Sequence, residues 1–360
     1  MAQTPIKTVA VWGCGGRGRL LTAAALALEG KRFVAAADAF EDAAQRFVTH
    51  ADHPEFHGVP AYTDPLEMLT THRPDLVILA TRPVDREAPI RACVEAGVKA
   101  VLAEKPLATS WGEARRICEL ITGSGMRLAI GHQRRYLDMF TEARRVVQEG
   151  LIGKITLIDA RAENLFDWGT HLLDAVGFVT AGLPVRHALG QFQRGSLVPV
   201  FDQPTEQAGV FHYSLEGDGP CGLPVVLRTQ HGVFGDALLR IVGDAGVVEA
   251  TVTPDSGIRV MRDGGPGTWE SLPVDPETHN ASTARAVADF VASVEAGEPC
   301  RIDLDEAMRA TEMIFAGLLS AVRGDRVSLP LEPLELPLGD LMQGHAGSVS
   351  MTESPVTRGA

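Results

Sequence analysis

A glycine-rich segment near the start of the chain, Gly13-Cys14-Gly15-Gly16-Arg17-Gly18, constrains the fold more than any other feature. It follows a short apolar run, TVAVW, and precedes an Ala/Leu-rich helical pattern, which is the context in which G-x-G-x-x-G indicates a dinucleotide site. Gly13 allows a tight turn, Gly15 lets the backbone approach a pyrophosphate, and Gly18 lets the helix pack closely on the strand. The segment therefore predicts a strand, a turn and a helix whose N-terminus faces a dinucleotide.

An acidic residue stands where the adenosine ribose of such a ligand would be bound. Asp38 ends the second apolar run, FVAAAD, at about the 20-residue spacing expected for this role. Its carboxylate would accept hydrogen bonds from ribose hydroxyls and repel a 2′-phosphate, and the next residue, Ala39, brings no compensating positive charge. We therefore expect NAD as the cofactor, with NADP disfavoured. Cys14 is interpreted as a small residue that fills space in the loop.

The order of apolar runs predicts an α/β protein of two domains. Up to about residue 133, short runs alternate with helical patterns, which is typical of right-handed crossovers and a doubly wound parallel sheet, the Rossmann arrangement. Later runs follow one another with Gly, Asp and Pro turns, which indicates an α+β domain with an open, mainly antiparallel sheet.

From this pattern we expect an NAD-binding domain at 1–133 and a substrate-binding, catalytic domain at 134–338, with a C-terminal helix able to pack back on the first domain. Two helices near the end are expected to stop at glycines, Gly297 and Gly324. Residues 339–360 are poor in large apolar groups and are expected to form a weakly ordered tail.

Composition disfavours several classes of partner. The formal net charge is -13 and no run of Lys and Arg occurs, so neither nucleic acid nor an anionic membrane surface is expected as a partner. No apolar stretch reaches the roughly 20 residues of a membrane span, and no secretory signal is recognisable at the start. Five scattered cysteines without a C-x-x-C pair indicate reduced thiols in the cytoplasm. The histidines at 50, 53 and 57 match no zinc spacing and are interpreted as a solvated surface, so no metal site is expected.

Six further segments occur in a characteristic order between about Val9 and Leu331: GVKAVLAEKPLATS, GHQRRY, EGLIGKI, FDWGTHLLD, RIVGDAGVVEA and LLSAVRGDRVSLPL. With this set the chain resembles the glucose-fructose oxidoreductase, inositol dehydrogenase and MocA family. The resemblance implies a Rossmann domain followed by an open sheet that walls the substrate cleft and joins subunits into a homo-oligomer, a dimer or tetramer. Two departures leave the substrate open: the loop after the fourth strand reads TRPVDRE, and Leu137 stands where a proline often follows the Arg-Tyr pair.

The resemblance also assigns catalytic roles to Lys105, Asp167 and His171, and implies oxidation or reduction of a carbinol in a sugar, cyclitol or related polyol. Such hydride transfer needs a proton acceptor and positive charge near the developing alkoxide. His171 suits the first role because an imidazole titrates near neutral pH, and Lys105 suits the second. If Asp167 begins the following helix, its spacing from His171 puts both side chains on one face.

Contacts to the cofactor are expected from the glycine loop and the strand ends, namely Gly13, Gly15, Gly16, Arg17, Gly18, Asp38, Thr81, Arg82, Pro83, Glu104 and Lys105. Contacts to the substrate are expected from Gln133, Arg135, Tyr136, Asn164, Asp167 and His171.

Three functions stay open at this point. The first is an NAD-dependent oxidoreductase of a sugar or cyclitol. The second is a glycosidase or lyase that retains NAD and oxidises its substrate transiently. The third is a non-catalytic regulator that senses a sugar or a dinucleotide. The intact set of Lys105, Asp167 and His171 favours an enzyme.

Overall fold

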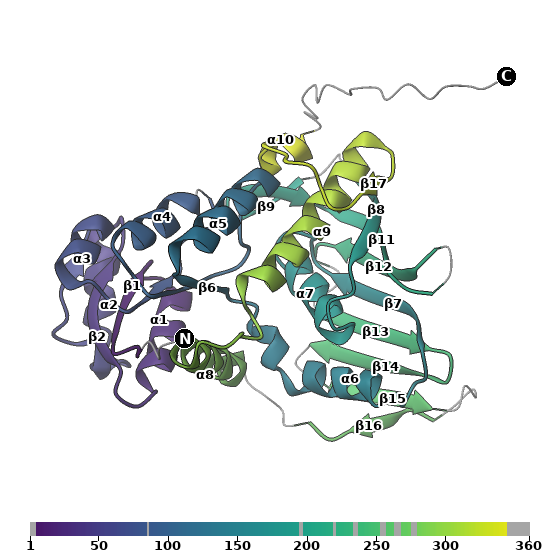
Figure 1. Cartoon of the computed structure of the whole chain (residues 1–360), viewed down its shortest axis with the longest axis horizontal. Coiled ribbons are helices and arrows are strands. Elements are labelled where there is room, and N and C mark those ends of the chain that lie inside the picture. The colour runs from purple at the N-terminus through teal and green to yellow at the C-terminus, as the bar shows by residue number, and fades with distance from the viewer. Residues whose placement is uncertain are drawn as a thin grey trace.

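The computed structural model describes residues 5–84, 86–193, 197–218, 221–232, 237–252, 257–262, 268–274 and 279–343. Within these ranges, a parallel sheet wrapped by helices lies beside a larger mixed sheet, with helices between the two (Figure 1).

The first sheet has six parallel strands in the spatial order β3-β2-β1-β4-β5-β6. The strands are β1 (Thr8–Trp12), β2 (Arg32–Ala37), β3 (Ala61–Tyr62), β4 (Leu76–Leu79), β5 (Ala100–Ala103) and β6 (Arg127–Ile130). The order reverses between β1 and β4, and such a reversal opens a crevice at the carboxyl ends of the strands. The predicted doubly wound Rossmann sheet is confirmed.

Helices connect these strands and cover both faces of the sheet. They are α1 (Gly16–Leu26), α2 (Glu41–Val48), α3 (Pro65–His72), α4 (Glu87–Glu95) and α5 (Trp111–Ser124), with short 3-10 turns η1 (Pro54–Phe56) and η2 (Gln133–Tyr136). Every residue of β4 and β5 is buried, as expected of strands covered on both faces. Local signals set the helix ends: the Ser110 hydroxyl accepts a hydrogen bond from the Glu113 amide at the start of α5, and Gly125 ends that helix with a φ of 75°.

The second sheet has nine strands in the order β16-β15-β14-β13-β7-β12-β11-β8-β17. They are β7 (Ile155–Ala162), β8 (Val185–Phe192), β11 (Ala208–Leu215), β12 (Leu223–Gln230), β13 (Ala237–Gly243), β14 (Gly246–Val252), β15 (Gly257–Arg262), β16 (Glu270–Leu272) and β17 (Val327–Ser328). Only the β7–β12 pair is parallel among the described pairs of this sheet, which confirms the mainly antiparallel prediction.

One face of this sheet is covered by α6 (Asp138–Gln148), α7 (Gly169–Val179) and α9 (Leu304–Arg323), as Figure 1 shows. Along β12 the side chains alternate between buried and partly or fully exposed, because successive residues of a strand point to opposite faces. The sheet is therefore open on its second face over the described part of the chain.

A separate two-stranded hairpin, β9 (Leu197–Val200) and β10 (Gln203–Glu206), lies between β8 and β11 in sequence. The last helix, α10 (Leu338–Met342), packs on β10 and buries Leu341 and Met342. The packed chain thus extends past residue 338, where the tail was expected to begin. The remainder of that expected tail, 344–360, lies outside the described residues.

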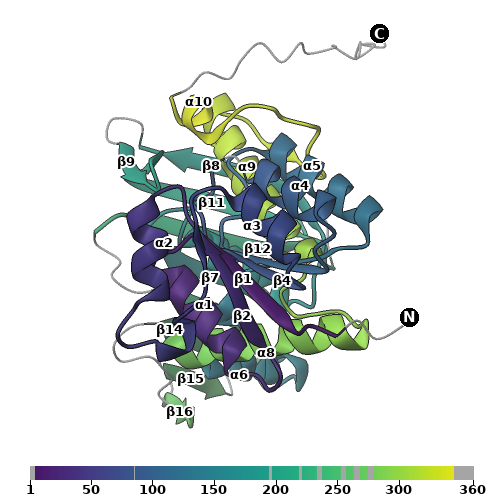
Figure 2. The same ribbon diagram turned by 90° about the vertical axis from the view of Figure 1, so that its left-hand side faces the viewer.

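Helix α8 (His279–Ala296) leaves the second sheet and packs against α1 of the first domain, as Figure 2 shows. Its Phe290 and Val291 share one apolar core with Val9 and Leu21. Just beyond it, the Ile302 carbonyl accepts a hydrogen bond from the Ile130 amide of β6 at 3.1 Å. Helices α8 and α9 are each followed by the predicted left-handed glycine, Gly297 with φ 72° and Gly324 with φ 71°.

Candidate functional site

The glycine turn after β1 has the backbone that a closely approached ligand requires. Gly13 has a φ of 104°, and a Cβ there would lie 2.6 Å from the Ala80 carbonyl carbon. A Cβ on Gly18 would lie 2.1 Å from the Gly13 oxygen, so the helix packs too tightly for any side chain. A Cβ on Gly15 would meet no atom within 4 Å. Open space therefore lies in front of the N-terminus of α1, where backbone amides attract a phosphate group.

A cavity of about 790 Å³ begins at this turn and extends past the ends of β2 and β4. Asp38, Thr81 and Arg82 line it. The Asp38 carboxylate accepts hydrogen bonds from the Cys14 amide at 2.7 Å and the Phe40 amide at 3.0 Å. Since an ionised carboxylate has about four acceptor positions, it keeps capacity for ribose hydroxyls. Turn, cavity and carboxylate together fit a bound dinucleotide.

Cys14 lies in this loop, and burial raises the pKa of its thiol to about 12. The thiol therefore stays protonated at neutral pH, which agrees with a space-filling role.

Charged groups fix the neighbouring strand ends. The Arg17 guanidinium pairs with the Glu104 carboxylate at 2.7 Å, directly after β5. Arg86 is fully buried and donates hydrogen bonds to the carbonyls of Glu104 at 2.7 Å and Thr81 at 3.1 Å. Burial lowers the pKa of Arg86 to about 10, and the side chain remains charged. It ties the ends of β4 and β5 together at the edge of the sheet where the cavity opens.

Lys105 and Asp167 form an ion pair between the two domains. Lys105 follows β5 in the first sheet, whereas Asp167 lies in the loop between β7 and α7, and each side chain is 14% exposed. The Asn164 side-chain oxygen accepts a hydrogen bond from the Asp167 amide at 2.6 Å, which fixes the loop as a turn. Helix α7 starts two residues after Asp167, at Gly169, so the condition under which Asp167 and His171 share one helix face is not met.

His171 lies in the first turn of α7 and is 3% exposed. Its ring meets the ring of His132, which follows β6, edge to face with centroids 5.6 Å apart. His132 Nε2 lies 3.0 Å from the Thr170 hydroxyl, and its Nδ1 lies 3.3 Å from the Asp174 carboxylate. Burial lowers the pKa of His132 even though Asp174 opposes the shift, so His132 is neutral at pH 7. His171 therefore contacts the buried, neutral imidazole of His132, which the sequence did not indicate as a site residue.

The remaining predicted substrate contacts are buried among protein groups. Arg135 pairs with Asp174 and Glu306, each at 2.7 Å, and is 4% exposed. The Tyr136 hydroxyl donates to Asp289 of α8 at 2.5 Å. Both side chains therefore hold helices together, and their described polar contacts are with groups of the protein. Gln133 and Asn164 are also buried, and Asn164 serves the loop described above.

Two groups near the site escaped sequence reasoning because their neighbours lie far away in the chain. At the tip of the β9–β10 hairpin, the Phe201 ring lies 5.5 Å from Lys105 Nζ, and Asp202 pairs with Arg82. At its base, the buried Glu206 carboxylate accepts a hydrogen bond from the Leu165 amide at 2.6 Å. Burial raises the pKa of Glu206 to about 7.

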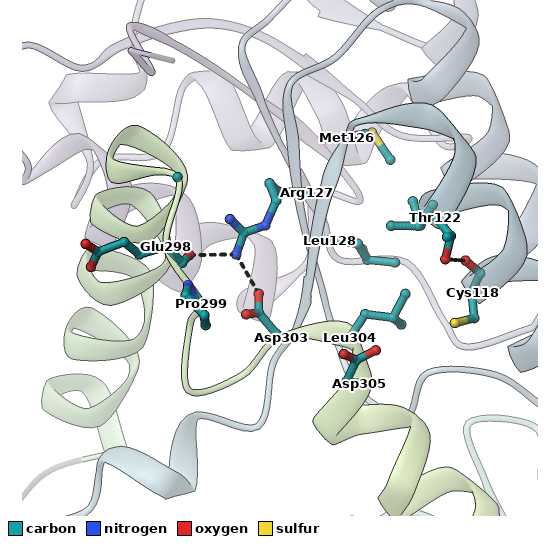
Figure 3. Close-up of a pocket in the computed structure, with 12 residues that line it drawn as sticks. Cys118, Thr122, Met126, Arg127, Leu128, Glu298, Pro299, Asp303, Leu304 and Asp305 are labelled. Atoms are coloured by element: carbon teal, nitrogen blue, oxygen red, sulfur yellow. Dashed lines mark hydrogen bonds and ion pairs between the residues drawn. The ribbon is translucent and has the colours of Figure 1, made fainter. Parts of the chain in front are cut away.

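A second cavity, of about 320 Å³, lies between α5, β6 and the loop joining α8 to α9 (Figure 3). Arg127 in this cavity donates to the Asp303 carboxylate at 2.9 Å and to the Glu298 carbonyl at 3.0 Å. Arg127 begins β6, so this cavity opens at the amino ends of the parallel strands, opposite the glycine turn. Its described lining includes none of the predicted site residues.

No group of three His, Cys, Asp or Glu side chains within the described ranges is placed to hold a metal ion. In the histidine cluster, His53 stacks on Phe56 and lies 2.8 Å from the Glu55 carboxylate. No described helix is long and apolar enough to span a membrane.

Fold and cavity together define a protein with an N-terminal dinucleotide-binding Rossmann domain and a second domain built on a mixed sheet. Residues 7–132 match the GFO_IDH_MocA model, described as an oxidoreductase family with an NAD-binding Rossmann fold. Inositol 2-dehydrogenase 2 of Saccharopolyspora erythraea is 32% identical over 161 residues, which are 43% of this chain and 45% of the relative. The N-terminal part of the chain is thus similar to the glucose-fructose oxidoreductase, inositol dehydrogenase and MocA family, and the chain aligns with less than half the length of such curated relatives.

Solved structures extend the likeness of fold to the second domain. An NAD-binding oxidoreductase from Klebsiella pneumoniae superposes with a TM-score of 0.76 at 16% identity, covering 91% of this chain and 100% of that one. Levoglucosan dehydrogenase in complex with NADH and levoglucosan also reaches 0.76, at 15% identity, covering 90% and 99%. At these identities the likeness concerns the fold alone.

Proposed function

We propose that the protein is an NAD-dependent dehydrogenase that oxidises, or in reverse forms, a secondary alcohol in a cyclitol, sugar or sugar derivative. The observation that carries this proposal is the Lys105–Asp167 pair. It joins the carboxyl end of β5, where an open α/β sheet binds its ligands, to the loop that leads to His171. On this proposal a cation, a carboxylate and an imidazole act near the carboxyl end of β5, the edge of the sheet at which the dinucleotide cavity opens.

Each residue has a role that follows from its chemistry. When bound, NAD supplies the hydride acceptor. His171 takes the proton of the reacting hydroxyl, and Lys105 places positive charge beside the developing alkoxide. Asp167 holds Lys105 in place through their ion pair.

The preference for NAD follows from Asp38. A 2′-phosphate would lie against this carboxylate, whose described hydrogen bonds come from the backbone amides of Cys14 and Phe40. Ribose hydroxyls, by contrast, can donate to it.

The substrate class draws support from named relatives. Inositol 2-dehydrogenases are among the sequence relatives, and levoglucosan dehydrogenase is among the structures of like fold. Cyclitols and anhydrosugars share a ring of secondary alcohols, so we extend that class to this chain as part of the proposal.

The test is a screen of cyclitols and pyranoses with NAD, read as the absorbance of NADH. Net NADH formation proportional to substrate supports the dehydrogenase. Bond cleavage without net NADH would identify an enzyme that retains its cofactor, and binding of NAD and sugar without any turnover would identify a sensor.

We further propose that the open face of the nine-stranded sheet joins subunits, and that the enzyme works in the cytoplasm. On that face, Leu189 of β8 and Val210 of β11 are 47% and 40% exposed on neighbouring strands. Exposed aliphatic side chains on an uncovered sheet face suit burial against a second copy. All five cysteines are free thiols, which suits a reducing compartment.

A further inference from the structure

The two residues at the tip of the β9–β10 hairpin differ in how well their side chains suit the backbone conformation there. Val200 pairs with Gln203, so the turn consists of Phe201 and Asp202 alone. Their φ values are 51° and 61°, in the left-handed region that a type I′ turn requires. Such positions favour Gly, Asn and Asp, because other side chains crowd the backbone there. Asp202 suits its position, whereas Phe201 does not, and strain of this kind points to a use for the side chain.

The same two residues contact the first domain. The Phe201 ring lies 5.5 Å from Lys105 Nζ and remains 39% exposed. Asp202 forms an ion pair with Arg82 in the loop after β4. The tip therefore reaches the segments that follow both β4 and β5, and the Phe201 ring lies near the ammonium that is proposed to face the alkoxide.

The base of the hairpin is fixed. The Thr205 hydroxyl donates to the Val198 carbonyl at 2.9 Å, which ties the two strands together. Glu206 is buried and holds the Leu165 amide at 2.6 Å, two residues before Asp167. Helix α10 packs on β10 from outside. A fixed base gives the ring at the tip a defined position beside Lys105.

We propose that Phe201 is a specificity-determining residue whose ring forms an apolar wall of the substrate cleft and stacks on the C–H face of a six-membered polyol ring. This inference rests on the function proposed above and names the shape of the substrate. The hydroxyl to be oxidised faces Lys105, while the ring face packs on Phe201.

The chemistry of a ring polyol fits such a wall. In a chair with mainly equatorial hydroxyls, the oxygens lie around the rim and the axial hydrogens lie on the two faces. A face can then pack on an aromatic ring without burying a hydroxyl that lacks a hydrogen-bond partner. An acyclic polyol has no fixed apolar face and gains nothing comparable.

The experiment compares Phe201→Gly, Phe201→Trp and a control in the same hairpin, Gln203→Ala. Glycine adopts the left-handed turn without strain, so the first variant removes the ring and keeps the hairpin. Steady-state kinetics are measured with myo-inositol and D-glucose as ring probes and sorbitol as the acyclic probe, and NAD affinity is measured by calorimetry. For a ring probe that is not turned over, calorimetric binding to the NADH-loaded protein replaces KM.

We expect Phe201→Gly to raise KM for the ring probes by about 10 to 100-fold, the range of an apolar contact in a pocket, with kcat within about threefold. NAD affinity and any activity on sorbitol stay unchanged, Phe201→Trp restores KM to within about threefold, and Gln203→Ala behaves as the native protein.

An unchanged KM for ring probes in Phe201→Gly would overturn the inference and leave the dehydrogenase standing. Weakened NAD binding with unchanged KM would overturn it too, by assigning the ring to the nicotinamide. If the native protein with its cofactor neither oxidised nor bound any cyclitol or pyranose of the screen described above, the proposed function itself would fall, and this inference with it.

Discussion

Glu206 offers a quantitative test of how the hairpin is anchored. Its carboxyl is buried, and burial raises its pKa from the ordinary value of 4.5 to about 7. The Glu206 carboxyl ionises near pH 4.5 in the unfolded chain and near pH 7 in the folded protein. The neutral form is therefore favoured in the fold, and the stability it contributes is complete below pH 4.5 and is lost as pH rises to 7.

The expected size of the loss follows from that shift. A difference of about 2.5 pKa units corresponds to about 3 kcal/mol, at about 1.4 kcal/mol per unit. For 360 residues unfolding as one unit, with about 2.1 cal/mol/K of unfolding entropy per residue, this equals about 4 °C in Tm. Glu206→Gln removes the titration and keeps an oxygen for the Leu165 amide.

The assay is the melting temperature of both proteins by circular dichroism from pH 4.5 to 8. The Tm of Glu206→Gln minus that of the native protein should increase by about 4 °C over this range, because only the native protein must bury a charge. An exposed residue, Glu216, changed to Gln serves as the control and should leave the native curve in place. Parallel curves for Glu206→Gln and native protein would refute the argument.

Four further predictions test the proposed function. His171→Ala should lower kcat by roughly 10² to 10⁴, the usual range for a positioned acid or base, with NAD affinity unchanged in calorimetry; near-native turnover would remove His171 from the mechanism. Lys105→Ala should reduce kcat/KM comparably, because it removes the charge facing the alkoxide, and native kinetics would contradict that role. Asp38→Ala should weaken NAD binding and so lower the ratio of the NADP dissociation constant to the NAD dissociation constant. Equal affinities of the native protein for the two cofactors would contradict the cofactor assignment. Charge on the open sheet face, as in Val210→Glu, should lower the mass seen by light scattering if that face joins subunits, and an unchanged mass would argue for another interface.

The first domain was predictable from sequence because its signals are local. Buried strands such as β4 consist of apolar residues alone, and the glycines of the turn follow β1 directly. In each case a short stretch of residues determines both its own conformation and its place in the parallel sheet.

The second domain and the site were less predictable because their determinants are distant in the chain. Arg135 looked available to a substrate, yet it is held by Asp174 and Glu306, which lie 39 and 171 positions away. Helix α7 begins after Asp167, because the Asn164 side chain accepts a hydrogen bond from the Asp167 amide and so forms a turn there. The hairpin gave no turn signal, since Phe201 stands at a turn position where Gly, Asn or Asp is favoured.

The return of α8 to the first domain affects the order of events during synthesis. The N-terminal core includes Phe290 and Val291, and the free edge of β6 is paired only when residues near Ile302 arrive. When the ribosome has released the first 133 residues, one flank of the Rossmann sheet still exposes apolar surface. This apolar surface of the nascent domain therefore stays exposed until most of the chain has emerged. During that interval it is a surface that a chaperone can bind.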